Sequence, residues 1–182
     1  MIEEIKAVMD DMEDDKAQGS DGFSANFIKV CWEIVHKYLF KMVTKSQRCE
    51  KIGGRTNYAF LALIPKEKDA NSFDRFHPIS LCNSLYKILA KLIANNVNPL
   101  LGKLISALQG GFVKGRHIVD NVIQVQEAIH SSFHRKEKGM LIKLDIKNAF
   151  DQVKLPFLYD VLLSFGFCPE FVNLIKACTN QP

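Results

Sequence analysis

The spacing of apolar residues divides the chain into helical segments separated by short polar breaks. In the longer segments, apolar side chains recur every three or four positions, which places them on one face of a helix. Ser24 precedes the second segment and has the side chain of a helix N-cap. Pro99 closes the third segment, and a short helix follows it. Helices are predicted over residues 2–15, 24–46, 81–97, 100–105, 118–133, 156–165 and 170–178.

Two segments have the composition of β-strands. Residues 58–64 form a continuous apolar run that Pro65 ends, which favours a strand covered on both faces. Residues 140–146 alternate apolar and polar side chains, whereas the charged segment 66–78 is predicted to be a loop. Since two strands cannot form an independently stable sheet, we expect an α+β chain whose small sheet is either covered by helices or incomplete.

Length and composition place the chain among ordinary globular proteins. Its 182 residues are 47% hydrophobic and 24% charged, and a chain of this length buries a sizeable core without disulfide or metal staples. The five cysteines are odd in number and contain no C-x-x-C pair, which argues against a disulfide framework or a zinc site. No apolar run approaches the roughly 18 residues of a membrane helix. We therefore expect a soluble, intracellular protein with no membrane partner.

Charge is distributed unevenly along the chain. Residues 1–16 hold seven acidic residues and two lysines, although the whole chain has a formal net charge of +4. The remainder is therefore basic, which is compatible with a polyanionic partner such as nucleic acid. A solvated, slightly basic surface explains the same counts, so charge alone leaves both interpretations open.

Residues 143–151, Lys-Leu-Asp-Ile-Lys-Asn-Ala-Phe-Asp, carry the strongest local signal for chemistry. Asp145 lies at the end of the strand predicted over 140–146, and Asp151 follows just beyond it. A carboxylate at a strand end can bind Mg²⁺, which takes one or two carboxylates together with substrate phosphates. The alternative is a turn acid followed by a helix-capping aspartate, and the segment by itself leaves both open.

Six short segments follow one another in an order and spacing that are specific only when taken together. They are K-A-Q-G-S-D-G-F (16–23), L-I-P-K (63–66), R-F-H-P-I-S-L-C-N (75–83), the run from Y-K to A-N (86–95), Q-G-G-F-V-K-G-R (109–116) and the acidic segment 143–151. This series resembles the reverse transcriptase domain of LINE-type (non-LTR) retrotransposons, and the last segment resembles polymerase motif A. The resemblance extends over nearly the whole chain.

The resemblance implies a fold and a reaction. The fold would be the fingers and the first part of the palm of a right-hand polymerase, helix-rich with an incomplete antiparallel sheet. Residues 1–56 would form an N-terminal helical extension, 57–138 the fingers and 139–182 a partial palm. The intact enzyme would extend a DNA primer on an RNA template with deoxynucleoside triphosphates (dNTPs), using Mg²⁺ as its cofactor.

The resemblance also implies roles for residues of motif A. Asp145 matches the aspartate that binds both catalytic metal ions, with the backbone carbonyl of Ile146 as a further ligand. Phe150 matches the steric gate that packs under the sugar and excludes a 2′-hydroxyl. The alternative for Phe150, taken without the motif, is an aromatic residue of the core.

Further roles are implied for basic residues of the fingers. Lys66 matches the lysine that reaches the incoming triphosphate. His77 stands where the family has an arginine, and a histidine cannot form a bidentate fork with phosphate. Arg75 lies two residues earlier and cannot be assumed to replace it. Lys114 and Arg116 are expected to contact backbone phosphates, although solvated surface charge explains them nearly as well.

The chain also departs from the family at its carboxyl end. Residues 152–182 contain neither the glycine-containing motif B nor the paired aspartates of motif C. We therefore expect a truncated chain that does not polymerise by itself and that exposes an unpaired, apolar strand over 140–146. Two alternatives to a polymerase fragment stay open, a non-catalytic RNA- or DNA-binding module and an inert remnant of a retroelement. The oligomeric state is not predicted.

Overall fold

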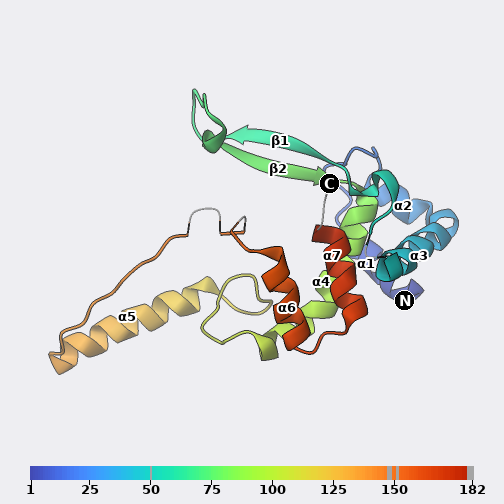
Figure 1. Ribbon diagram of the computed structural model, residues 1–182. Helices are drawn as coiled ribbons and strands as arrows, with labels where there is room; N and C mark the ends of the chain where they lie inside the picture. The colour runs from blue at the N-terminus through green and yellow to red at the C-terminus, as the bar shows by residue number, and fades with distance from the viewer. Residues whose placement is uncertain (50, 147–148, 151, 180–182) are drawn as a thin grey trace. The chain divides into compact units, whose positions relative to one another are not determined.

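The computed structural model describes residues 1–49, 51–146, 149–150 and 152–179, with the backbone alone for 54 and 55 (Figure 1). The chain forms two compact units. The first comprises Met1–Ala94 together with Tyr159–Pro182, and the second comprises Asn95–Leu158. Segments far apart in the sequence thus share the first unit.

Helices dominate the described residues, and one two-stranded sheet accompanies them. The elements are α1 (Ile2–Asp10), α2 (Ala25–Val30), α3 (Trp32–Cys49), a 3₁₀ turn (Gly54–Asn57), β1 (Ala59–Pro65), a second 3₁₀ turn (Phe73–Arg75), β2 (Phe76–Cys82), α4 (Ser84–Leu104), α5 (Ile118–Arg135), α6 (Leu155–Ser164) and α7 (Pro169–Thr179). This composition agrees with the predicted α+β class.

The hydrophobic core lies in the first unit and joins both ends of the chain. Apolar faces of α1, α3 and α7 and the first half of α4 supply most of it, and α7 packs alongside α3 (Figure 1). Burying these side chains supplies the main free energy of folding for the unit. The buried cluster is Ile5, Val8, Met9, Ile28, Leu39, Val43, Ile52, Ile88, Leu89, Leu92, Leu174, Ala177 and Cys178.

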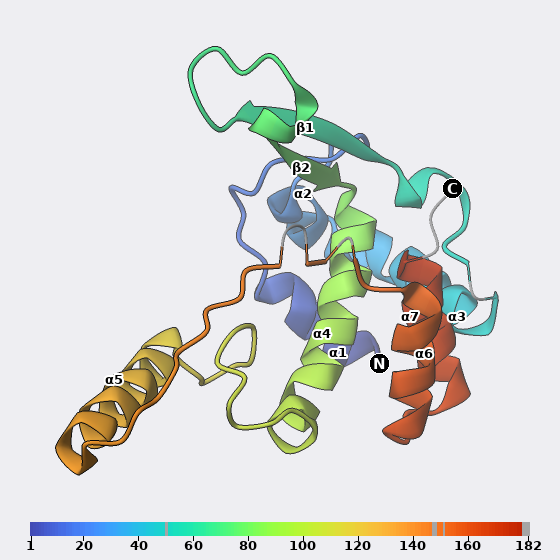
Figure 2. The same cartoon turned by 60° about the vertical axis from the view of Figure 1, so that its left-hand side comes forward.

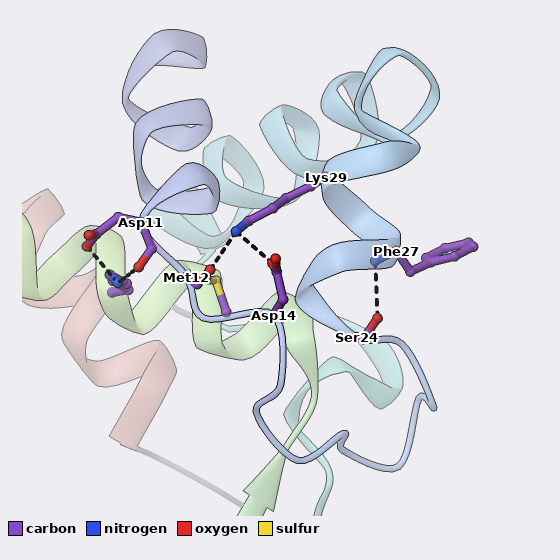
Figure 3. A network of polar contacts seen from close by, with 7 residues as sticks. Asp11, Met12, Asp14, Ser24, Phe27 and Lys29 are labelled. Atoms are coloured by element: carbon purple, nitrogen blue, oxygen red, sulfur yellow. Dashed lines mark hydrogen bonds and ion pairs between the residues drawn. The ribbon is translucent and has the colours of Figure 1, made fainter.

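The first two predicted helices are present with altered bounds. α1 ends at Asp10 rather than at residue 15, because the acidic residues that follow are unfavourable at the negative end of a helix dipole. Ser24 is the N-cap that was predicted, and its hydroxyl accepts a hydrogen bond from the Phe27 amide at 3.1 Å (Figure 3). The single helix predicted after Ser24 is divided into α2 and α3 at Cys31, whose ψ of 17° departs from helical geometry.

Two lysines hold the acidic segment that follows α1. The Lys29 Nζ donates to the Met12 carbonyl at 2.6 Å and to an Asp14 carboxylate oxygen at 2.8 Å (Figure 3). The Lys91 Nζ lies 2.7 Å from both the carbonyl and a carboxylate oxygen of Asp11. Carbonyl groups beyond the last turn of a helix have no partner within it, so these cations stabilise the end of α1. The acidic N-terminal segment is therefore part of the folded unit.

The sheet is an antiparallel hairpin of β1 and β2, and the sequence predicted only the first of these strands. β1 confirms the strand expected at 58–64, and it pairs with β2 in a register that runs from Ala59 opposite Cys82 to Pro65 opposite Phe76. The loop predicted over 66–78 was wrong from Phe76 onward. Pro78 argues against a central strand, but both strands of a two-stranded sheet are edges, where proline is tolerated.

The expectation that residues 58–64 would be covered on both faces was also wrong. Most side chains of β1 are exposed, among them Phe60 at 60% and Leu61 at 62%. β2 is likewise exposed over most of its length. The continuous apolar run therefore reflects β-propensity on a projecting hairpin rather than burial inside a sheet.

α4 replaces two predicted helices. The helix continues through Pro99 and ends at Leu104, so the break expected at the proline and the separate helix at 100–105 were wrong. A proline inside a helix removes one backbone hydrogen bond, which is a local cost. Burial of Ile88, Leu89 and Leu92 fixes the direction of the helix before the proline is reached.

Residues 140–146 do not form the predicted strand. They have no regular secondary structure and pair with no other described strand, since a strand needs the backbone groups of a neighbour. Their apolar side chains are exposed, including Met140 at 85% and Leu144 at 84%. α5, α6 and α7 confirm the remaining predicted helices to within two residues at each end. α6 lies beside α7 (Figure 2), and the hydroxyls of Tyr159 and Thr179 share a 2.6 Å hydrogen bond between the two helices.

The junction between β2 and α4 is held by the motif at residues 16–23. The Asn83 carboxamide oxygen accepts hydrogen bonds from the Ser20 hydroxyl at 2.8 Å and the Asp21 amide at 3.0 Å. Asp21 in turn accepts from the Ser84 amide at 2.9 Å, which caps the first turn of α4. Gly19 lies so close that a Cβ there would overlap the backbone at Cys82 and Asn83. Two motifs about 60 residues apart in the sequence therefore form one structural unit.

We predict that Asp21→Ala lowers the free energy of unfolding by about 0.5–2 kcal/mol, because an N-terminal cap of α4 is lost. Urea denaturation followed by circular dichroism measures the change. Asp15→Ala is the matched control, since Asp15 is exposed and the substitution removes the same charge. Equal stability of the two variants would show that the contact with the Ser84 amide does not stabilise the junction.

A second prediction concerns Cys178, which is 8% exposed in α7. Burial raises the pKa of its thiol to about 11. At pH 8 only about one molecule in a thousand then carries the reactive thiolate. We expect iodoacetamide to modify Cys178 far more slowly than the exposed Cys49 and Cys168, as measured by peptide mass spectrometry. Equal rates in the folded protein would contradict burial of α7, and equal rates in urea serve as the control.

Candidate nucleotide and nucleic-acid site

Lys66 lies at the loop end of the hairpin, one residue after β1. Its backbone amide donates to the Arg75 carbonyl at 2.9 Å, which extends the ladder by one step beyond Pro65 and Phe76. Its Nζ donates to the Asp74 carbonyl at 2.7 Å, and the side chain is exposed. The ammonium group is thus held at the loop by one exposed hydrogen bond that a stronger anionic partner could replace.

The register shows which cation accompanies Lys66. His77 lies opposite Ile64 in the ladder, two positions from the end, whereas Arg75 lies directly opposite Lys66. The Arg75 guanidinium is 2.9 Å from a carboxylate oxygen of Glu67, with both side chains about half exposed. Such a pair is weak because solvent screens it. The hairpin therefore brings together Lys66 and Arg75, a neighbour that the sequence alone could not establish.

Arg116 is occupied inside its own loop. Its guanidinium donates to the carbonyls of Ile105, Ser106 and Gln109, at distances between 2.5 and 3.0 Å. The first two of these carbonyls follow the last turn of α4, where backbone acceptors have no helical partner. Arg116 therefore stabilises the end of α4 and the turn after it, a structural role that its place in a basic motif did not indicate.

The rest of the loop after α4 is also organised by local contacts. The Asn121 side chain donates to the Leu108 carbonyl at 3.2 Å, and a Cβ at Gly110 would lie about 3.0 Å from that side chain. Gly115 has a φ of +81°, which favours glycine. Lys114 lies between these points with an exposed side chain. The loop thus presents Lys114 to solvent while Arg116 is directed inward.

Asp145 and Ile146 lie in the exposed segment that follows α5. Both side chains are exposed, and the described residues contain no group of three His, Cys, Asp or Glu side chains that could hold a metal ion. Asp151, the second acid of the motif, lies outside the described residues. Mg²⁺ requires near-octahedral oxygen coordination. The part of the chain that the structure describes therefore does not contain a complete magnesium site. Asp145 could contribute one carboxylate to such a site.

Phe150 contacts an aromatic residue that the sequence did not single out. Its ring lies 5.7 Å from that of Phe112, centroid to centroid, in an edge-to-face arrangement at 81°. Both rings are strongly exposed, Phe150 at 76% and Phe112 at 91%. Phe112 also has a φ of +60°, which is uncommon for a bulky residue. Phe150 is thus not a core residue, and its contact links the motif at 109–116 with motif A.

A cavity of about 710 Å³ lies between α5 and residues 137–141. Its walls are largely apolar and include Val125, Ile129 and Phe133 of α5 together with Met140. None of the predicted site residues line it. The cavity therefore marks an apolar face of α5 rather than the place of the predicted chemistry.

Comparison with known proteins identifies the chain. The family described as "Reverse transcriptase (RNA-dependent DNA polymerase)" matches residues 64–181, which is more than half of the sequence. The chain belongs to the reverse transcriptase family. The match begins in β1 and includes every residue predicted for the site, from Lys66 to Phe150. The resemblance to non-LTR retrotransposons is confirmed by the relatives below.

Relatives from mobile elements match almost the whole chain. The Xenopus laevis "Transposon TX1 uncharacterized 149 kDa protein" is 27% identical over 175 residues, 96% of this chain and 13% of the relative. The Drosophila funebris "RNA-directed DNA polymerase from mobile element jockey" is 25% identical over 179 residues, 97% of the chain and 19% of the relative. A Drosophila melanogaster "Probable RNA-directed DNA polymerase from transposon BS" is 27% identical over 155 residues, 84% and 17% respectively. The chain spans less than a fifth of these relatives.

The helices were also compared with the length and hydropathy needed to cross a membrane. Among the described residues, none of the helices satisfies both requirements.

We predict that Arg116→Ala and Lys114→Ala change different properties, the stability of the loop and the affinity for RNA respectively. Arg116→Ala removes three charge-assisted hydrogen bonds, so it should destabilise the loop by about 1–3 kcal/mol and speed amide exchange of Gln109. Lys114→Ala should leave exchange unchanged and weaken RNA binding, lowering the salt slope by about one. Hydrogen exchange and RNA titrations at several salt concentrations measure both. Unchanged loop exchange with weakened RNA binding in Arg116→Ala would instead make Arg116 a phosphate ligand.

Proposed function

We propose that this chain supplies the nucleotide- and template-contacting part of an RNA-directed DNA polymerase. The polymerase would extend a DNA primer on an RNA template with dNTPs. The observation that carries the proposal is the family match over residues 64–181, together with relatives whose names state this activity. In this proposal residues 57–138 act as fingers, 139–182 as part of the palm and 1–56 as a helical extension.

Lys66 is proposed to contact the triphosphate of the incoming nucleotide. Its exposure at the end of the hairpin and its single exchangeable side-chain contact support this role. Arg75 can provide the bidentate contact that His77 cannot, because it lies opposite Lys66 and is held only by a solvent-screened pair with Glu67. His77 then lies farther along the hairpin as a secondary polar contact.

Phe150 is proposed to exclude a 2′-hydroxyl by packing against the sugar. Its 76% exposure supports this role, because a ring that reads a ligand must be accessible in the free protein. The edge-to-face contact with Phe112 limits the orientations open to the ring. Phe112 would in this way position Phe150.

Asp145, with the Ile146 carbonyl, is proposed as this chain's contribution to a Mg²⁺ site. The exposed carboxylate is free to bind a metal, but the described residues provide no cluster that completes the coordination. Catalysis would therefore need ligands beyond those described. A second candidate function follows from the same observation, namely binding of RNA or DNA without catalysis, through exposed cations such as Lys114.

The experiment that tests the proposal is Asp145→Ala in the polypeptide that contains this chain. Losing a metal ligand removes several kcal/mol of transition-state stabilisation, so we expect RNA-templated primer extension to fall by about a thousandfold. RNA affinity should change little. The matched control is Asp160→Ala, because Asp160 is exposed on α6 and the substitution removes the same charge.

The outcomes separate the two candidate functions. Extension that survives Asp145→Ala would contradict the metal assignment. RNA binding without extension in the unsubstituted protein would favour the non-catalytic module. Absence of both extension and salt-dependent RNA binding would contradict both functions.

A further inference from the structure

Two histidines lie one helical turn apart near the end of α5. His130 and His134 are separated by four residues, a spacing that places their side chains on the same face of the helix. Their rings are stacked, with centroids 5.5 Å apart and planes inclined by 22°. Both side chains are exposed. They lie together on the surface of the second unit and have no part in the site described above.

Two imidazoles at this spacing have the chemistry of a metal chelate. Neutral imidazole nitrogen is a preferred ligand of Zn²⁺, Ni²⁺ and Cu²⁺, and histidines at positions i and i+4 of a helix can share one ion. Exposed side chains change rotamer freely, so both rings can turn a nitrogen toward a common point. Hard ions such as Mg²⁺ prefer oxygen ligands and would not select this pair.

An acidic residue lies on the same side of the helix. Glu127 precedes His130 by three positions, and both residues line one shallow recess of about 400 Å³. A carboxylate there attracts a cation and leaves room for water to complete the coordination. The described residues contain no group of three metal-binding side chains close enough to enclose an ion, so the site is open and has two protein ligands.

We propose that His130 and His134 bind one divalent transition-metal ion, Ni²⁺, Cu²⁺ or Zn²⁺, at the surface of α5. Binding would stabilise α5, because the chelate forms only when this turn is helical. The effect matters for this helix in particular, since α5 has no buried side chain among the described residues. The site would lie in the last two turns of α5, before the exposed segment that carries Asp145, and it differs in ligand type from any magnesium site there.

The test is a titration of the purified chain with NiCl₂ by isothermal calorimetry, with Cu²⁺ electron paramagnetic resonance as a second readout. One Ni²⁺ should bind, and the Cu²⁺ spectrum should show coupling to two imidazole nitrogens. The exposed thiols of Cys49 and Cys168 could also bind these metals. The titrations are therefore made on the natural chain and on a C49S/C168S background.

Substitutions at the pair decide the assignment. Losing a residue that only hydrogen-bonds a metal ligand lowers metal affinity by roughly tenfold or more. His130→Ala or His134→Ala removes a ligand itself, so each should weaken Ni²⁺ binding by at least that factor. The double variant H134A/R135H keeps the number of histidines but moves one off the shared face, and it should bind as weakly as His134→Ala. His36→Ala, in α3, is the control that should not change affinity.

Three results would overturn the proposal. The first is the absence of saturable Ni²⁺ binding below about 1 mM. The second is wild-type affinity in H134A/R135H, which would show that spacing does not matter. The third is a loss of Ni²⁺ affinity in His36→Ala as large as in the variants of His130 and His134, which would place the metal elsewhere. None of these results bears on the proposed polymerase function.

Discussion

The junction between β2 and α4 depends on the amide of Asn83 and on the close approach of Gly19. The Asn83 oxygen accepts from Ser20 and Asp21, and Asp21 caps the first turn of α4 at Ser84. These contacts fix the angle at which the hairpin leaves the helical core. Because Lys66 lies at the far end of that hairpin, its position relative to the core of the first unit is set at this junction.

Helical periodicity was a reliable guide where a helix has one apolar face against the core. The apolar stripes of α3 and the first half of α4 appear in the structure as buried residues such as Leu39 and Ile88. Periodicity failed where partners decide the outcome. Residues 140–146 alternate like a strand but pair with no described strand, and β2 forms despite Pro78 because β1 lies beside it.

The motifs singled out candidate site residues but did not indicate the contacts that each side chain makes. The sequence grouped Lys114 and Arg116 as phosphate contacts, yet Arg116 donates to three carbonyls of its own loop. Phe112 lies in the motif at 109–116, but the sequence assigned it no role, and its contact with Phe150 is known only from the structure. Contacts of this kind depend on loop geometry, and a single sequence carries no periodic signal for it.

The hydrogen bonds made by the basic residues change the meaning of the formal charge of +4. The ammonium groups of Lys29, Lys87 and Lys91 donate to the carbonyls of residues 12, 17 and 11, respectively, and Arg116 donates to carbonyls of its own loop. Side chains held in this way are less available to pair with RNA phosphates and so to displace the cations condensed on the RNA. The electrostatic part of the binding free energy scales with the number of counterions released from the RNA. It is therefore set by the smaller number of lysine and arginine side chains that can reach phosphates, and not by the composition.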